Sequence, residues 1–376
     1  MGKIDGLIQQ YCPDGVEFVP LSSISELVRG KVISKDYIKD NEGDYPVYSS
    51  QSADDGVMGR IDTYMYDGDY ITWTTDGAYA GTIFRRSGKF NITNVCGLVK
   101  VISKEIILDF LYYWLYVEAP KYVYRGMGNP KLMSNVMGTI SIPLPPLPVQ
   151  EAIVNILDRF TVYAAELQAE LQARQQQYQY YQDILLNKSQ YSKHITIGEL
   201  CVVKKGNTPI QKAKEGKYPL VVTTMERRSC DTFQFNTNAV CIPLVSSRGH
   251  GVASLNHIYY QEGMFALGNI LCAVIPNDEK VVKAKFLYYY LEYAKDYTLV
   301  PLMKGGANVS LHCSDIEKVK IPLPPLTEQE RIIYILDRFD TLVNDLSQGL
   351  PAEIEARQQQ YEYYRDRLLT FKRKEA

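Results

Sequence analysis

The chain has 376 residues, 46% of them hydrophobic, and a formal net charge of −2. This length predicts two or more domains, each large enough to bury its own core. No run of 18 apolar residues occurs, and the N-terminus lacks the pattern of a signal peptide. These features predict a soluble, cytoplasmic protein with no membrane partner.

The sequence also lacks the motifs of several catalytic classes. Its seven cysteines are scattered and form no CxxC pair, which argues against a zinc site and against a disulfide framework. It has no Asp/Asn-Pro-Pro-Tyr methyl-transfer motif, no GxxxxGKS/T phosphate loop and no paired HxxxH site. We therefore expect no metal, no cofactor and no catalysis by this chain alone.

The most informative feature is a duplication of two sequence blocks. IPLPPLPVQEAIVNILDRF (142–160) returns 179 residues later as IPLPPLTEQERIIYILDRF (321–339). ARQQQYQYYQDILL (173–186) returns 183 residues later as ARQQQYEYYRDRLL (356–369). The segments before these blocks are much less alike. We interpret the chain as two divergent modules, each followed by a similar helical connector.

Each module is predicted to be one copy of an α+β domain. Residues 60–102 and 240–275 alternate apolar and polar side chains around glycine-containing turns, as short strands and hairpins do. A compact helix, a glycine-rich turn and a strand follow in the same order in both modules. The helices are FLYYWL (110–115) and FLYYYL (286–291), and the turns are 126–129 and 305–308.

Charge distinguishes the two modules. Residues 188–321 hold 17 basic and 11 acidic side chains, whereas residues 1–142 hold 14 basic and 17 acidic ones. Only the second module is basic, so the first must concentrate its cations locally if it binds nucleic acid.

The proline-rich hinges cannot be helical, and a heptad pattern begins after each of them. Apolar positions in the first connector alternate steps of four and three, which predicts a coiled-coil seam. The second connector has one extra step of four at Gly349-Leu350-Pro351, where we expect one helix to end and another to start with Pro351 in its first turn. The seam positions are Ile153, Leu157, Phe160, Ala164, Leu167, Leu171, Arg174, Tyr178, Tyr181 and Leu185, then Ile332, Leu336, Phe339, Val343, Leu346, Leu350, Ile354, Arg357, Tyr361, Tyr364 and Leu368.

The connectors are predicted to run antiparallel. If residues 188–321 fold as one domain with neighbouring termini, the second connector starts near the end of the first and returns along it. Two similar antiparallel helices create a pseudo-twofold axis, and B-DNA has the same kind of dyad. This arrangement predicts a reader of a split DNA site with an unread gap.

A four-residue unit in the first connector suggests how the gap is set. The unit AELQ occurs twice in succession, at 165–168 and 169–172. One unit advances a helix by ~6 Å and rotates it ~40° beyond a full turn. One base pair advances B-DNA by ~3.4 Å and ~35°. The hypothesis is that one unit shifts the gap by one base pair.

The two duplicated blocks and the GLPAEIEARQQQYEYYRD segment (349–366) together resemble the specificity subunit of type I restriction–modification enzymes over essentially the whole chain. The resemblance implies an α+β fold in which two target recognition domains are separated by two long antiparallel coiled-coil helices. It implies that each domain reads half of a split site on double-stranded DNA. It also implies that the helices bind two methyltransferase (modification) subunits, that restriction subunits join outside them, and that repeats such as 165–172 set the spacer.

The implied domain boundaries follow the duplicated blocks. Residues 1–142 form the first target recognition domain and 143–187 the central conserved helical region. Residues 188–321 form the second target recognition domain and 322–376 the C-terminal helical region. The basic run Lys372-Arg373-Lys374 is expected to be a frayed, solvated end.

DNA recognition requires donors and acceptors on exposed loops. In the first module we predict contacts from two polar loops and from the glycine-rich turn. The alternative is that these are ordinary hairpin loops around a packed tryptophan. The predicted contact residues are Ser49, Ser50, Gln51, Trp73, Thr74, Thr75, Asp76, Tyr79, Arg125, Asn129 and Lys131.

In the second module we predict the same kind of site. Arg248 lies between small residues and is suited to reach a guanine, although a solvated surface arginine would look the same. Glycines in the later turn allow close approach to a phosphate but also suit a plain tight turn. The predicted contact residues are Thr224, Arg227, Ser247, Arg248, His250, Lys304 and Asn308.

Two other functions fit part of the sequence. A non-catalytic coiled-coil scaffold that displays two protein-binding domains is supported by the weak net charge. A standalone methyltransferase is disfavoured by the missing motifs. Salt-sensitive DNA binding together with methyltransferase subunits would exclude the scaffold, and cofactor binding by the isolated chain would support the methyltransferase.

Overall fold

The computed structural model describes residues 2–51, 53–126, 128–187, 193–249, 251–345 and 347–375. The chain divides into two compact units. Unit 1 contains Met1–Glu166 and Ala356–Ala376, and unit 2 contains Leu167–Glu355. Each unit therefore combines one module with helical segments from both connectors.

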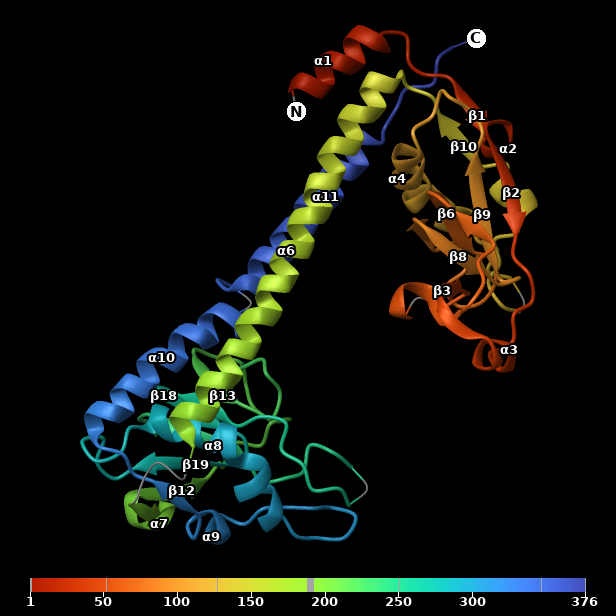
Figure 1. The fold of residues 1–376 in the computed structure, drawn as a ribbon. Coiled ribbons are helices and arrows are strands. Elements are labelled where there is room, and N and C mark those ends of the chain that lie inside the picture. Colours follow the sequence, from red (N-terminus) through yellow and green to blue (C-terminus); the bar gives the residue numbers. More distant parts are fainter. Residues whose placement is uncertain are drawn as a thin grey trace. The chain divides into compact units, whose positions relative to one another are not determined.

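The first module is built from three small sheets (Figure 1). The first sheet is antiparallel throughout, whereas the second has a parallel pair at its centre, in which Val47 lies opposite Asn91. The strand orders are β2(Ser25–Arg29)-β9(Cys96–Val101)-β6(Tyr70–Thr74)-β7(Ile83–Arg86), β4(Val57–Ile61)-β3(Glu42–Tyr48)-β8(Lys89–Ile92)-β5(Tyr66–Asp67) and β1(Phe18–Pro20)-β10(Ser141–Pro143). The helices are α1(Gly2–Tyr11), α2(Leu21–Ile24), α3(Lys35–Asp40), α4(Leu108–Glu118) and α5(Ser134–Met137), with 3₁₀ turns η1(Ala53–Gly56) and η2(Ala119–Tyr122).

The second module repeats this topology strand for strand, including the central parallel pair, in which Leu220 lies opposite Ala266. The strand orders are β12(Cys201–Lys205)-β19(Leu271–Pro276)-β16(Ala239–Pro243)-β17(Tyr259–Gln261), β14(Arg228–Cys230)-β13(Tyr218–Val221)-β18(Met264–Leu267)-β15(Phe235–Asn236) and β11(His194–Thr196)-β20(Lys320–Pro322). The helices are α7(Ile197–Leu200), α8(Ala284–Thr298) and α9(Cys313–Ile316), with the 3₁₀ turn η4(Val300–Leu302). The predicted fold class, with two copies of one α+β domain and long helices, is confirmed.

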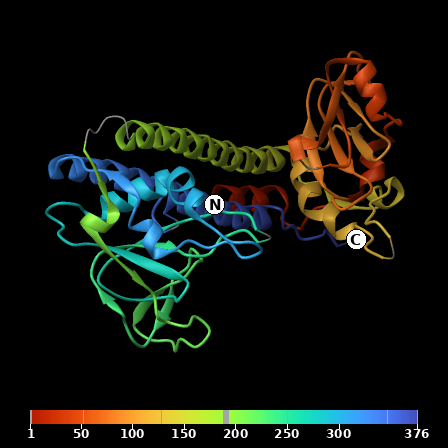
Figure 2. The same ribbon diagram turned by 90° about the horizontal axis from the view of Figure 1, so that it is seen from below.

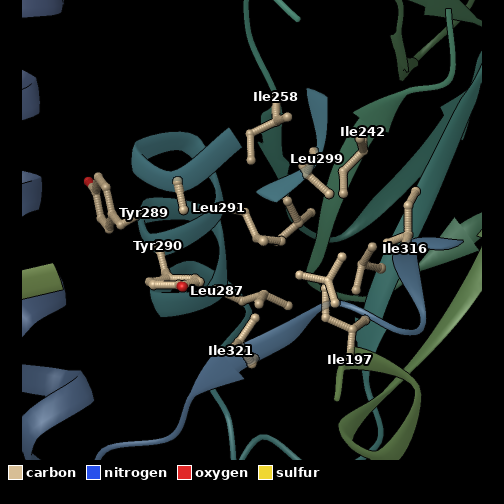
Figure 3. Close-up of a cluster of buried hydrophobic side chains, with 14 of the residues drawn as sticks. Ile197, Ile242, Ile258, Leu287, Tyr289, Tyr290, Leu291, Leu299, Ile316 and Ile321 are labelled. Atoms are coloured by element: carbon tan, nitrogen blue, oxygen red, sulfur yellow. The ribbon is translucent and has the colours of Figure 1, made fainter. Parts of the chain in front are cut away.

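The main core of the second module lies between its repeated helix and its sheet (Figure 3). Leu287 and Leu291 of α8 point toward Ile242 of β16 and are fully buried. Spacing of four residues places both side chains on one face of the helix. Each fully buried side chain of this size contributes about 1.5–3 kcal/mol. The predicted segment FLYYYL (286–291) thus lies in the helix that covers this core.

The long helices begin directly after the proline-rich hinges. Helix α6 (Leu147–Leu186) is continuous, whereas the second connector forms α10 (Leu326–Asn344) and α11 (Leu350–Leu368). The predicted break is therefore confirmed, with Pro351 in the first turn of the new helix. A Cβ on Gly349 would lie 2.5 Å from the carbonyl oxygen of Thr341, so only glycine fits there. The seam position Leu346 lies outside the described residues.

The two copies of the duplicated blocks pack against each other reciprocally. In unit 1, Phe160 of the first copy contacts Tyr361 and Tyr364 of the second, with ring centroids 6.2 and 5.5 Å apart. The guanidinium of Arg357 lies 5.4 Å from the ring of Tyr163, so the partner's numbering falls as that of α6 rises. The α6 and α11 segments of this unit are therefore antiparallel, as predicted.

Unit 2 contains the mirror pairing of the same blocks. Phe339 of the second copy lies between Tyr178 and Tyr181 of the first, with ring centroids 6.0 and 5.1 Å apart. Figures 1 and 2 show α10 alongside the second half of α6. The seam tyrosines are thus packing residues, whereas Tyr180 and Tyr363 are each 60% exposed.

A buried glutamine at the start of each long helix ties the helix to its module. Gln150 accepts a hydrogen bond from the N–H of Ile107 (2.8 Å) and donates to the carbonyls of Glu105 and Pro145 (both 2.7 Å). Gln329, the same residue of the second copy, bonds Lys283, Val281 and Pro324 in the same way. Both glutamines are fully buried. This explains the glutamine in the repeated PLPPLxxQ motif.

The aspartate of the repeated ILDRF motif makes a second attachment. Asp158 accepts a hydrogen bond from the Tyr113 hydroxyl (2.6 Å) and lies 3.4 Å from Arg85. Asp337 accepts from the Tyr289 hydroxyl and lies 2.7 Å from Lys285. Burial, and then the hydrogen bond to the carboxylate, raise the pKa of both tyrosines. The phenols therefore stay protonated as donors at neutral pH.

The C-terminal tail corrects one prediction. Lys372, Arg373 and Lys374 were expected to be a frayed end, but this segment is hydrogen-bonded to the first module. The N–H of Val16 donates to the carbonyl of Lys372 (2.8 Å), and Lys374 returns a bond to Val16 (2.9 Å). The pattern of charges could not reveal this contact, because it joins the two ends of the sequence.

We expect Gln150→Ala to lower the free energy of unfolding by about 2–4 kcal/mol, because one buried N–H and two buried carbonyls lose their partner. Gln329→Ala should do the same in unit 2. Chemical denaturation of the full chain measures both effects, with Gln175→Ala on the exposed face of α6 as the control. An unchanged unfolding midpoint in both variants would contradict the attachment.

Candidate nucleic-acid interface

The predicted contact loops of the first module come together around Arg29, at the end of β2. Its guanidinium donates to the carbonyl of Asn94 (2.6 Å) and to the Thr75 hydroxyl (3.2 Å). The neighbouring Thr93 hydroxyl donates to the hydroxyl of Ser49 (3.1 Å). The loop after β3 and the loop after β6, separate in sequence, are thus linked through residues 93–94.

The glycine-rich turn joins the same cluster. The N–H of Gly77 donates to the carbonyl of Pro130 (3.1 Å), and Lys131 forms an ion pair with Asp76 (3.6 Å). Both charged side chains are partly exposed, so this pair adds little to stability. Its effect is to hold the turn beside the loop after β6, which brings the three predicted segments to one end of the module.

Trp73, Thr74 and Thr75 do not fit the predicted role as DNA contacts. Their side chains are at most 1% exposed, and the indole N–H of Trp73 donates to the carbonyl of Leu132 (2.9 Å). A Cβ on Gly97 would lie 2.3 Å from the Trp73 ring, so the tryptophan packs directly on that glycine. The structure favours the alternative for these three residues: they are packing residues at the base of the loop and support its exposed side chains.

The other predicted residues of this module reach the surface. Tyr79 is 52% exposed, and Arg125 and Asn129 are exposed on the turn. Ser49, Ser50 and Gln51 are half-buried, and the Gln51 amide donates to the carbonyl of Val57. The loop after β3 is therefore held by internal hydrogen bonds and still presents polar groups to solvent.

The second module assembles its predicted loops at the equivalent place. The N–H of Ser246 donates to the carbonyl of Val309 (3.0 Å), and the N–H of Gly251 donates to that of Ala307 (3.2 Å). A cavity of about 260 Å³ lies beside them and includes Thr223 from the loop after β13. Its lining is mostly polar and contains Ser246, Ser247, Asn256 and His257.

The predicted residues of this module are mostly exposed. Thr224, Arg227, Arg248, Lys304 and Asn308 all reach solvent. Ser247 is exposed as well, and its hydroxyl donates to the side chain of Asn256 (2.9 Å) in the lining of the cavity. Lys304 lies 3.9 Å from Asp315, a distance at which the ion pair is weak. His250 lies outside the described residues.

Arg29, which bonds the loops of the first cluster, was not among the predicted contact residues, and Lys205 is its counterpart in the second module. Arg29 and Lys205 hold the same register position at the ends of β2 and β12, and a glycine follows each. A Cβ on Gly30 would lie 2.1 Å from the carbonyl oxygen of Ile92, and Gly206 is equally close to that of Gly268 (2.2 Å). The signal that could have identified them is a cation at the end of β2 and of β12 with a glycine directly after it.

Across the described ranges, no group of three or more histidine, cysteine, aspartate or glutamate side chains is placed to hold a metal ion. No helix in the part of the chain that the structure describes is long and apolar enough to cross a membrane.

Comparison with known proteins identifies the family. Residues 13–174 and 191–356 each match the model of the type I restriction modification DNA specificity domain. The chain belongs to this family. The family resemblance predicted from the duplicated blocks is confirmed, and so is the predicted class of function, a type I specificity subunit. The first matched segment covers its module from residue 13 and most of α6, and the second covers its module and all of α10.

Relatives align along nearly the whole chain. It is 33% identical over 362 residues to a protein of Mycoplasma pneumoniae described as a type I specificity subunit, covering 93% of this chain and 96% of the relative. A Haemophilus influenzae protein described as a type I restriction enzyme specificity subunit is 32% identical over 388 residues, covering 95% and 96%. The crystal structure of the type I S subunit from M. genitalium shares the fold, with 18% identity and a TM-score of 0.60 over 94% of this chain and 95% of that one.

The burial of Trp73 makes a stability prediction. Trp73→Phe should lower the free energy of unfolding by about 2–4 kcal/mol, since the carbonyl of Leu132 loses its donor and the smaller ring leaves a void. Thermal unfolding of the full chain measures this. Intact stability together with lost DNA binding would instead restore Trp73 as a contact residue.

Proposed function

We propose that this chain selects the DNA sequence on which a type I restriction–modification complex acts. Each module reads one half of a split site on double-stranded DNA, and the helices set the unread gap. The chain has no catalytic activity of its own. It directs two methyltransferase subunits, with restriction subunits outside them, and this role on DNA places it in the cytoplasm.

One observation carries the proposal beyond family membership. In both modules, three polar segments distant in sequence converge at topologically equivalent loop ends, and each cluster includes exposed cations. Lys131 and Arg125 supply them in the first module, and Arg248 and Lys304 in the second. A site built twice in this way suits a ligand that presents two similar grooves, as duplex DNA does.

The division of labour within each cluster follows from chemistry. Arginine and amide side chains on exposed loops can form paired hydrogen bonds with base edges and so discriminate sequence. Lysines at the rim contact phosphates, which position the module and add salt-dependent affinity without sequence information. The acidic first module uses the local group Arg29, Arg125 and Lys131 for this purpose.

The domain boundaries remain those proposed from the sequence. Residues 1–142 and 188–321 are the target recognition domains, and 143–187 and 322–376 are the conserved helical regions. The buried glutamine attachments support this division, because each fixes a recognition domain to the helix that follows it. The exposed Tyr180 and Tyr363 are suited to contact the methyltransferase subunits.

We expect Lys131→Ala and Arg248→Ala each to weaken DNA binding by the complex of this chain with its methyltransferase subunits, by roughly tenfold. Lys104→Ala and Lys280→Ala are matched controls. These exposed lysines follow the C-terminal ends of β9 and β19, away from the strand ends that pair with Arg29 and Lys205. Gel shifts at several salt concentrations measure the affinities. Arg248→Ala should relax base preference, whereas Lys131→Ala should mainly reduce the salt dependence.

The same measurement separates the alternative function. Binding to no DNA at any salt concentration would favour a protein-binding scaffold over a specificity subunit. Equal losses in the test variants and the controls would show that the effect is only one of net charge.

Deleting Ala169, Glu170, Leu171 and Gln172 should shorten the preferred gap and leave both half-sites unchanged. The deletion removes one turn of α6, ~6 Å and ~40° beyond a full turn, which is near the rotation of one base pair. Selection from duplexes with gaps of graded length measures the preference. The spacer hypothesis fails if the deleted and intact chains choose the same gap.

A further inference from the structure

Arg86, the last residue of β7, is a buried cation that the predicted site did not include. Its side chain is 2% exposed. It donates to a carboxylate oxygen of Asp55 (2.5 Å), to the carbonyl of Asp55 (2.8 Å) and to the Thr72 hydroxyl (3.2 Å). The guanidinium also lies 3.7 Å from the ring centroid of Tyr48 and 4.3 Å from that of Phe84. The guanidinium is therefore held by three hydrogen bonds and packed against two aromatic rings.

The two bonds to Asp55 hold the loop between β3 and β4, of which residues 49–51 and 53–56 are described. The other contacts, with Thr72, Tyr48 and Phe84, are to strands β6, β3 and β7. Asp54 and Asp55 both adopt left-handed backbone conformations, with φ of 49° and 50°. Two consecutive non-glycine residues in this region are unfavourable by of order 1–3 kcal/mol each and persist only where the surroundings impose them. The loop is also closed by the N–H of Ser49, which donates to the carbonyl of Gly56 (3.0 Å). Arg86 bonds both the carboxylate and the carbonyl oxygen of Asp55, one of these two residues.

The charge balance makes Asp55 necessary for the arrangement. Arg86 is buried, whereas the side chain of Asp55 is 69% exposed. A buried guanidinium is strongly destabilising unless a counter-charge and hydrogen bonds satisfy it. The ion pair therefore anchors the exposed loop to the buried Arg86 at the end of β7.

The second module has a guanidinium at the same place but takes it from the loop. Arg227, in the loop between β13 and β14, lies 4.8 Å from the ring of Tyr259, the counterpart of Phe84. It donates to Gln261 (3.3 Å), which occupies the register position of Arg86. The arginine and its acceptor have exchanged sides.

We propose that this guanidinium contact is a positioning device for the recognition loop, and that Arg86 determines the base preference of the first half-site through the conformation of residues 49–51 and 53–56. The inference rests on the proposed function and extends it. Arg86 itself does not touch DNA, because its side chain is covered. Ser50 and Gln51 precede Asp55 in the same loop and present the polar groups whose placement depends on the Arg86–Asp55 ion pair.

Asp55→Asn is the decisive variant, because asparagine has the same size and tolerates the left-handed conformation while losing the charge. The wild-type and variant complexes with methyltransferase subunits select from a pool of duplex oligonucleotides with randomised positions. We expect discrimination at one half-site to fall about tenfold and the other half-site to be unchanged. Arg86→Lys, which keeps the charge but loses the fork of hydrogen bonds, should show a smaller loss at the same half-site.

Arg60→Gln is the matched control, since Arg60 lies on β4, is exposed and donates only to the carbonyl of Asp44 among the bonds resolved in the described residues. Hydrogen exchange of the 48–57 segment gives a second readout and should be faster in Asp55→Asn alone. Unchanged base preference at both half-sites, or an equal loss at both, would overturn the proposed positioning role of Arg86. A wild-type complex that selects no split site would instead contradict the proposed function itself.

Discussion

Reciprocal packing of the duplicated helical blocks is the interaction on which the rest of the structure depends. Phe160 packs on tyrosines of the second copy, and Phe339 packs on the equivalent tyrosines of the first. Such aromatic pairs contribute about 0.5–1.5 kcal/mol each beyond the area they bury. Because each pairing joins one copy to the other, unit 1 combines two separate segments of the chain, 1–166 and 356–376, whereas both copies contribute to unit 2 within the continuous segment 167–355. A duplicated sequence can build this arrangement because the same two surfaces meet twice.

The attachments at the start of each long helix fix each module to the packed helices. A buried glutamine and a tyrosine–aspartate bond hold each module to the helix that leaves it. Buried polar groups of this kind are costly when any partner is missing, so they define one geometry rather than a range. The repeated residues of the connectors thus fix the position of each module on its helix, whereas the candidate contact residues lie on the divergent loops.

The two modules meet the same requirement with different charges. The first is acidic overall and places Arg29, Arg125 and Lys131 in its candidate site, with the buried Arg86 bonded to Asp55 of the loop between β3 and β4. The second is basic and places the arginine in the loop itself, with glutamine as its neutral partner. The shared topology shows that the scaffold tolerates such exchanges.

The sequence by itself determined the duplicated α+β architecture, the heptad seam and the break before Pro351. These features depend on periodicity and on proline, which act over a few residues and can be read locally. It also located three loop segments per module, but not which side chains reach solvent. The tertiary structure decided that Trp73 is buried, that Arg29 and Arg86 organise the loops, and that the tail returns to Val16. Those outcomes depend on contacts between residues tens to hundreds of positions apart, and no local pattern records which distant partner a side chain will meet.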